Sequence, residues 1–284
     1  MHPAAPDDRR GLIDALDQTV QSVIDLGFGC RDEDFDRPTD CPGWTVKDQI
    51  SHVVGVEKSF AGIRAEKVEV PAYAHLRHPA ARDIEREVEA RRSRSGREVV
   101  AELADFHPER IESLRESPAD LDTVVGGPLG PDTTLGHLLR MRIIDTWCHE
   151  QDIRNALDRP GDLDTPAAAV FTEAVLRALP RVVSRVAGIG AGHAVVIDVT
   201  GPVVAREGAR VITGEDERPY GEALFSGHHR PDGEEQLDVT SIKLTTDALT
   251  RRAAGRRSTD EIHYAVTGDK EIARRVLDAL VITH

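Results

Sequence analysis

Four residues that could carry chemistry lie on one side of a predicted helix in the middle of the chain. The segment HLLRMRIIDTWCHEQDIR covers residues 137–154, and at about 100° per residue Arg142, Asp145, His149 and Asp152 fall in one narrow stripe. Apolar residues occupy the other sides, whereas an ordinary surface helix has a wide polar face and a narrower apolar one. The pattern therefore predicts an apolar helix whose polar stripe lines a cavity inside a helical bundle.

Asp145 and His149 stand one helical turn apart and could share a metal ion. Such a pair needs a third protein ligand from another helix. His52 is the best candidate, because it lies in a predicted helix of about residues 46–63, on the flank of that helix's apolar stripe. The three residues would form a two-histidine, one-carboxylate site suited to Zn²⁺ and acceptable to Fe²⁺, Mn²⁺ or Ni²⁺. Spacing alone also fits an ordinary hydrogen-bonded pair, so both interpretations stay open.

The other two residues of the stripe suit supporting roles around such a site. Asp152 could orient a ligating imidazole, and Arg142 could balance charge or hold an anionic substrate. The sequence contains no GxSxG motif, Walker loop or dinucleotide-binding glycine pattern, so common hydrolase and nucleotide-binding functions lack support. Cys41, in CPGW, is better explained by a turn before a helix, with Trp44 as a packing anchor, than as a nucleophile.

Composition narrows the class of protein and of partner. At 284 residues the chain is about twice the length of a typical domain, so two domains are expected. The net charge of −14 argues against binding to nucleic acid or to an anionic membrane and favours a small-molecule partner. The sequence has no run of 18 apolar residues, no apolar segment at its N-terminus and no CxxC pair among its three cysteines. These features predict a soluble cytoplasmic protein with reduced thiols.

Periodicity predicts helices in the first part of the chain and a mixture of strands and helices in the second. The expected fold class is a helical bundle over residues 1–160 followed by a small α+β domain over residues 161–284, with a mainly antiparallel sheet packed by helices on one face. Helices are expected at about 11–27, 46–63, 81–94, 98–113, 137–154 and 167–186, strands at 194–202, 236–246 and 262–269, and helices after the last two strands, capped by Thr246 or Asp247 and by Asp269.

Four arginines, at positions 91, 92, 94 and 97, form a basic cluster in this acidic chain. A solvated helix face is the simpler explanation, and an anion-binding patch is the alternative.

Three stretches of the sequence resemble a known family. DCPGWTVKDQISHVVGVE, residues 40–57, and RMRIIDTWCHEQDIRNALDRPGDLD, residues 140–164, are similar to motifs of the mycothiol-dependent maleylpyruvate isomerase family, within the DinB-like superfamily of metal-binding four-helix bundles. VTGDKEIARRVLDALVIT, residues 266–283, resembles the sterol-carrier-like C-terminal domain found with it. The resemblance extends over nearly the whole chain.

The resemblance implies a metal centre and a thiol. The family's ligands fall on His52 and His149, and Asp145 stands where the family has Glu, which keeps the charge with a shorter reach and could change the metal preference. Zinc is the first choice of metal. The family also implies mycothiol, the low-molecular-weight thiol of actinobacteria, and the excess of arginine over lysine is compatible with the GC-rich genome of such a host.

The expected function is therefore that of a metal-dependent enzyme that activates the thiolate of mycothiol for attack on a small electrophilic substrate. The outcome would be cis–trans isomerisation of a maleylpyruvate-type acid or S-transfer, and the metal site does not discriminate between them. The alternative is a non-enzymatic protein with a vestigial metal site and an apolar tunnel in its C-terminal domain. Charged strand residues such as Asp198, Asp238 and Lys243 favour a packed accessory domain instead.

Overall fold

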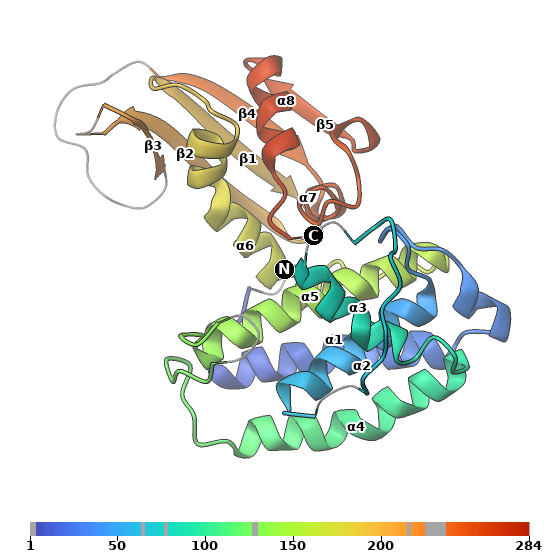
Figure 1. Cartoon of the computed structure of the whole chain (residues 1–284). Coiled ribbons are helices and arrows are strands. Elements are labelled where there is room, and N and C mark those ends of the chain that lie inside the picture. The colour runs from blue at the N-terminus through green and yellow to red at the C-terminus, as the bar shows by residue number, and fades with distance from the viewer. Residues whose placement is uncertain are drawn as a thin grey trace. The chain divides into compact units, whose positions relative to one another are not determined.

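Figure 1 shows the computed structural model of the chain, which describes residues 4–63, 66–76, 79–126, 130–214, 217–224 and 237–283. The chain divides into two compact units, one of Pro6–Gly161 and one that combines the residues before Pro6 with those from Asp162 onwards. Within the described residues, no helix combines the length and the apolar character that crossing a membrane requires.

The first unit is helical. Its four long helices, α1, α2, α4 and α5, pack against one another, and the shorter α3 packs on α2. A single 3-10 turn, η1, follows α1. The helices are α1 (Arg9–Phe28), α2 (Val46–Phe60), α3 (Pro79–Glu89), α4 (Gly96–Glu116) and α5 (Leu135–Ala156), and η1 is Asp32–Asp36. Each expected helix of this unit is present, but α3 ends at Glu89 and not at residue 94, because the chain turns before Ser95 caps α4.

Local hydrogen bonds fix where the two site-bearing helices begin. Thr45 and Asp48 form a capping box, in which Asp48 N donates to Thr45 Oγ1 at 3.3 Å and Thr45 N donates to the Asp48 carboxylate at 3.0 Å. Thr134 caps α5 by accepting a hydrogen bond from His137 N at 3.3 Å. The apolar faces of both helices are buried, as Ile50 and Ile143 show with no exposed surface. Capping and burial together set the rotation of α2 and α5 about their axes.

The second unit contains one mixed sheet with helices packed on it (Figure 1). The strand order is β3-β2-β1-β4-β5, and all neighbours are antiparallel except the parallel pair β1–β4. Helix α6 packs against β2 and β3, and α8 packs against β4 and β5. The elements are α6 (Pro166–Arg181), β1 (His193–Thr200), β2 (Val204–Thr213), β3 (Pro219–Ala223), β4 (Asp238–Leu244), α7 (Thr246–Ala253), β5 (Tyr264–Thr267) and α8 (Lys270–Ala279), with short helical turns at Val182–Val186 and Thr259–Glu261. The expected fold class is confirmed.

Two of the five strands, β2 and β3, were not predicted from the sequence. In β2 the apolar alternation is interrupted by charged residues, which pair across the sheet: Arg206 lies 3.3 Å from Asp198, and Arg210 Nε donates to Glu222 at 2.6 Å. β3 is short and contains Pro and Gly. Thr245, rather than Thr246 or Asp247, caps α7, while Asp269 caps α8 as expected. Gln236, the expected start of the second predicted strand, lies outside the described residues.

The basic cluster is neutralised by carboxylates. Every arginine in it has an acidic partner, so the cluster is not an open anion-binding patch. The Arg97 side chain is exposed, as the simpler explanation predicts, whereas Arg94 is half-buried and Arg91 is buried. Arg91 and Arg94 bind Glu102, Arg92 binds Glu85, Asp48 and Glu89, and Arg97 binds Asp32.

Glu102 should make the stability of the protein depend on pH. Burial raises the pKa of Glu102, but hydrogen bonds from Arg91 and Lys58 outweigh it and lower the pKa to about 2. A depressed carboxyl pKa contributes stability that is fully present above about 4.5 and is lost as the pH falls towards 2. We expect Glu102→Gln to be less stable than the wild type at pH 7, and the gap to shrink by about 2 kcal/mol between pH 5 and pH 3.

Urea unfolding followed by circular dichroism at several pH values measures this gap. Glu112→Gln, an exposed position on the same helix, is the control and should change stability by less than about 0.5 kcal/mol at every pH. A gap that stays constant from pH 5 to pH 3 would contradict the prediction.

Candidate metal centre

The structure brings together the three residues expected to bind a metal, between α2 and α5. His52 Nε2 lies 3.1 Å from Asp145 Oδ2, and His149 Nε2 lies 3.4 Å from Asp145 Oδ1. One ligand atom of each residue lies within 4.8 Å of those of the other two. Two ligands bound tetrahedrally to zinc with bonds of about 2.0–2.1 Å are about 3.4 Å apart, so the donor set and its spacing fit one shared ion.

Burial prepares these groups for a cation. Both histidines are almost completely buried, whereas the Asp145 side chain is 30% exposed. Burial lowers the pKa of His52 to about 4, although the neighbouring Asp145 opposes this, so His52 is neutral at pH 7 and keeps a lone pair to donate. Burial alone would raise the pKa of Asp145, but His52 and Arg142 hold it well below its usual range, so Asp145 is ionised.

Gln49 orients the second imidazole. Its Oε1 lies 2.5 Å from His149 Nδ1, and its Nε2 donates to Thr39 Oγ1 at 2.6 Å, which sets the direction of the amide. Because an amide oxygen only accepts, His149 carries its proton on Nδ1 and turns the lone pair of Nε2 towards Asp145. Asp152, which the sequence suggested for this task, is fully buried, and its Oδ2 lies 3.8 Å from His149 Nδ1, beyond hydrogen-bond distance.

Arg142 and Glu57 hold the carboxylate of Asp145. Arg142 is buried and donates from Nη1 to Asp145 Oδ2 at 2.5 Å, from Nε to Glu57 Oε1 at 2.8 Å and from Nη2 to Thr146 Oγ1 at 3.3 Å. Glu57 is buried as well and accepts from Arg110 Nε at 3.2 Å. Burial alone would raise the pKa of Glu57, but Arg142 and Arg110 hold it below its usual range. Of the two roles proposed for Arg142, the observed contacts match charge balance.

Sequence reasoning missed Gln49 and Glu57 as supporting residues. Gln49 stands three residues before His52, and so shares its helix face, which is a signal that could have found it. Glu57 is an acidic residue among apolar neighbours near the end of the same helix, where only a buried partner would make it favourable.

Trp44 packs on both imidazoles, as expected of a packing anchor. Its ring centroid lies 5.1 Å from that of His52 and 5.6 Å from that of His149. Its Nε1 donates to Glu85 Oε2 on α3 at 2.9 Å, and His75 Nε2 lies 3.0 Å from the same oxygen. The loop before α2, the loop before α3 and α3 itself are therefore tied to the site through one buried carboxylate.

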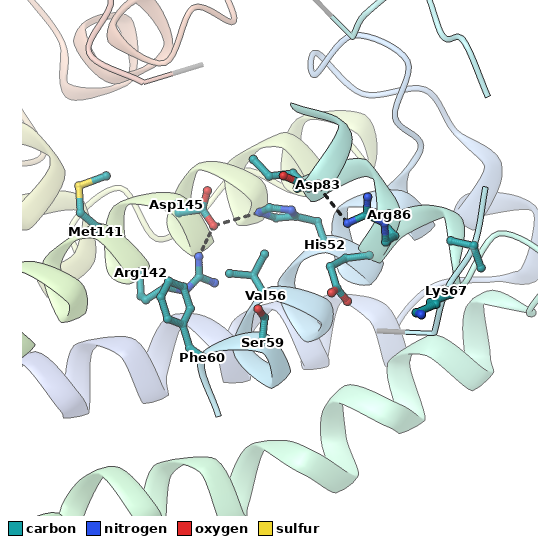
Figure 2. A pocket seen from close by; sticks show the side chains of 13 residues that line it. His52, Val56, Ser59, Phe60, Lys67, Asp83, Arg86, Met141, Arg142 and Asp145 are labelled. Carbon is teal, nitrogen blue, oxygen red and sulfur yellow. Dashed lines mark hydrogen bonds and ion pairs between the residues drawn. The ribbon is translucent and has the colours of Figure 1, made fainter. Parts of the chain in front are cut away.

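A cavity of about 750 Å³ opens beside His52 and Asp145 (Figure 2). His52, Asp145 and Arg142 lie at its wall, and Figure 2 shows Asp145 bridging the other two. The rest of the lining comes from α2, α3, α5 and the segment before α3. A small molecule in this cavity would therefore touch a candidate metal ligand directly.

Comparisons with known proteins agree with this description. Residues 16–154 match the family model for the mycothiol maleylpyruvate isomerase N-terminal domain. Two crystal structures are similar, one of the mycothiol-dependent maleylpyruvate isomerase and one of a histidine-to-alanine mutant of it. Their TM-scores are 0.53 and 0.55 and their identities 17% and 16%, and each match covers 92% of this chain and 94% of the other. No curated protein sequence matched the chain.

The fold and the site define a class of protein in which a helical bundle with a buried His-Asp-His cluster precedes an α+β unit. Residues 16–154 belong to the family of the mycothiol maleylpyruvate isomerase N-terminal domain, which is named for an isomerase. The resemblance seen in the sequence is confirmed. At identities of 16% and 17% the solved structures show a shared fold, and the reaction has to be argued from this chain's own site.

Glu57→Gln should destabilise the protein by about 3 kcal/mol, because it leaves two buried guanidinium groups without the negative charge that they share. The free energy of unfolding in urea, at pH 7 and without added metal, measures the change. Glu109→Gln, an exposed position on α4, is the matched control and should lie within about 0.5 kcal/mol of the wild type. A loss below about 1 kcal/mol for Glu57→Gln would show that the network is not important for folding.

Proposed function

We propose that this protein is a metal-dependent enzyme that brings a low-molecular-weight thiol, mycothiol, to an electrophilic carbon of a small molecule. The observation that carries the proposal is the cluster of His52, Asp145 and His149, of which His52 and Asp145 lie at the wall of a cavity of about 750 Å³. The thiol is supported by the family, since the isomerase of the two similar crystal structures is named as mycothiol-dependent.

His52, Asp145 and His149 would hold a divalent metal ion, and two imidazoles with one carboxylate favour zinc. When bound, such an ion would supply the positive charge that keeps a thiol in its reactive thiolate form at neutral pH. Gln49 keeps the lone pair of His149 Nε2 directed at the site, and Arg142 keeps the Asp145 carboxylate in place.

The cavity would hold the electrophile against the thiol and exclude water from it. Isomerisation of a cis double bond and permanent S-transfer both begin with a thiol beside a bound electrophile, so the same arrangement serves either outcome. The non-enzymatic alternative predicts a ligand tunnel in the C-terminal unit. A cavity of about 300 Å³ lies in that unit, but the cavity beside His52 and Asp145, of about 750 Å³, lies in the helical unit, which favours the enzyme.

Zinc binding tests the metal centre. We expect the wild type, after reconstitution with Zn²⁺, to hold close to one ion per chain by inductively coupled plasma mass spectrometry. His52→Ala, Asp145→Ala and His149→Ala should each weaken the affinity more than about a hundredfold, and Gln49→Ala about ten- to a hundredfold, because it acts through His149. His137→Ala, an exposed histidine on the same helix α5, is the control and should bind like the wild type.

Thiol binding tests the rest of the proposal. Titration of mycothiol into the zinc-loaded protein by calorimetry should show binding whose heat changes with the ionisation enthalpy of the buffer, because the thiol releases its proton. The metal-free protein and the His149→Ala variant should bind mycothiol much more weakly. A wild type that cannot be loaded with Zn²⁺, Fe²⁺, Mn²⁺ or Ni²⁺, or that binds mycothiol equally well without metal, would overturn the proposal.

A further inference from the structure

The cavity beside the metal centre also carries information about the substrate. We propose that it takes an uncharged, apolar molecule, so that the substrate of the proposed reaction is an uncharged electrophile and not a dicarboxylate. That the bound molecule is a substrate rests on the proposed function, but the preference of the cavity for uncharged ligands can be measured without any reaction.

The cationic groups of the lining are already engaged or lie at its edge. Arg142 donates to Glu57, Asp145 and Thr146. Arg86 binds Asp83, with 3.0 Å between Nη1 and Oδ1 (Figure 2). The third cation of the described lining is Lys67, whose side chain is exposed. A dicarboxylate held inside a protein needs paired, preferably bidentate, cations, and among the described residues the inner wall offers no arginine free to provide them.

The charges of the lining are also balanced. The acidic residues Asp83, Glu87 and Asp145 match the basic residues in number, and Glu57 lies buried behind Arg142. A dianion entering the cavity would meet the Asp145 carboxylate, and like charges in a cavity repel a ligand strongly. Apart from the two paired arginines, the cation of the described lining is the exposed Lys67, which does not offer the bidentate contact of a guanidinium. A thiolate bound to a metal ion would compensate the positive charge of that ion. The ion would therefore not pair with the second carboxylate of a diacid.

Most of the remaining wall is apolar. Phe60 lies over the guanidinium of Arg142, with 5.5 Å between its ring centroid and the central carbon of the guanidinium, and so covers part of the nearest cation. Val56, Ile84 and Met141 add aliphatic and thioether surface from three different helices. Ile84 is 43% exposed although it lines the cavity, which is costly for an apolar side chain unless a ligand covers it. This wall suits an alkyl or aryl group.

An activated alkene is the simplest electrophile of this kind. In the addition, a bond forms between the thiol sulfur and one alkene carbon while the π pair moves onto the conjugated carbonyl. The proton that the thiol loses is then returned to the other alkene carbon, so the net change is addition of S–H across the double bond. No oxidant or further reactant is needed.

Dimethyl maleate and maleate test the substrate class, because they share a cis double bond and differ in charge. For each, kcat/KM with mycothiol is divided by the uncatalysed rate constant with mycothiol, which removes the difference in intrinsic reactivity. We expect this ratio to be at least about tenfold higher for the diester. A ratio that is equal or higher for maleate would overturn the inference.

Two fluorescent dyes test the cavity independently of any reaction. N-phenyl-1-naphthylamine is uncharged, and 8-anilinonaphthalene-1-sulfonate has the same skeleton with one negative charge. The metal-free wild type should bind the uncharged dye more tightly. Ile84→Arg places a cation on the wall beside Glu87, which Arg91 already neutralises, and should lower this preference about tenfold. Ile63→Arg, a comparably exposed isoleucine outside this cavity, is the control and should leave it unchanged.

The outcomes separate the two proposals. If the uncharged dye binds more tightly and this preference falls only in Ile84→Arg, while neither dimethyl maleate nor maleate is converted with mycothiol, the proposed enzyme is rejected and the uncharged ligand is kept. Mycothiol-dependent conversion with a preference for maleate would keep the enzyme and reject the uncharged substrate. Equal binding of both dyes, or equal effects of Ile84→Arg and Ile63→Arg, would also reject the inference about the cavity.

Discussion

The structure of the helical unit depends on a buried carboxylate that two arginines share. Glu57 lies on α2 and is almost without exposed surface, a position that an acidic residue tolerates only when it is paired. Its partners are Arg110 on α4 and Arg142 on α5, so one side chain links three of the four long helices. Arg142 also binds Asp145, so the position of Asp145 depends on the same ion pairs. The position of the carboxylate in the candidate metal centre therefore follows from the packing of the bundle.

A second buried carboxylate does the same for the walls of the cavity. Glu85 on α3 accepts from Trp44 and lies within hydrogen-bond distance of His75, while Trp44 packs on both imidazoles. The short helix that supplies Ile84 to the cavity is thus connected to the residues that would bind the metal. A substitution in the cavity wall on α3 should therefore also affect the candidate metal ligands, because both are held by the same buried polar groups.

The similarity to a solved isomerase defines the fold and leaves the reaction to the local chemistry of this chain. Two features of the site bear on that chemistry in different ways. The cluster of His52, Asp145 and His149 could hold a metal ion. The cavity, with its paired arginines and apolar wall, would contact the small molecule that binds beside the cluster.

The sequence by itself determined the features that depend on neighbours along the chain. Helical periodicity placed Asp145 and His149 one turn apart, and the capping residues Thr45, Thr134 and Asp269 set helix starts through bonds that span three residues or fewer. The position of His52 on the flank of a second predicted helix made it the candidate third ligand, and the family resemblance agreed with that choice. Tertiary structure decided which partners meet. Gln49, and not Asp152, lies within hydrogen-bond distance of His149 Nδ1. Carboxylates pair with the arginine cluster, and the charged strand β2 lies inside a sheet. Such contacts join residues far apart in the chain, so they depend on how whole helices and strands pack, which no local pattern specifies.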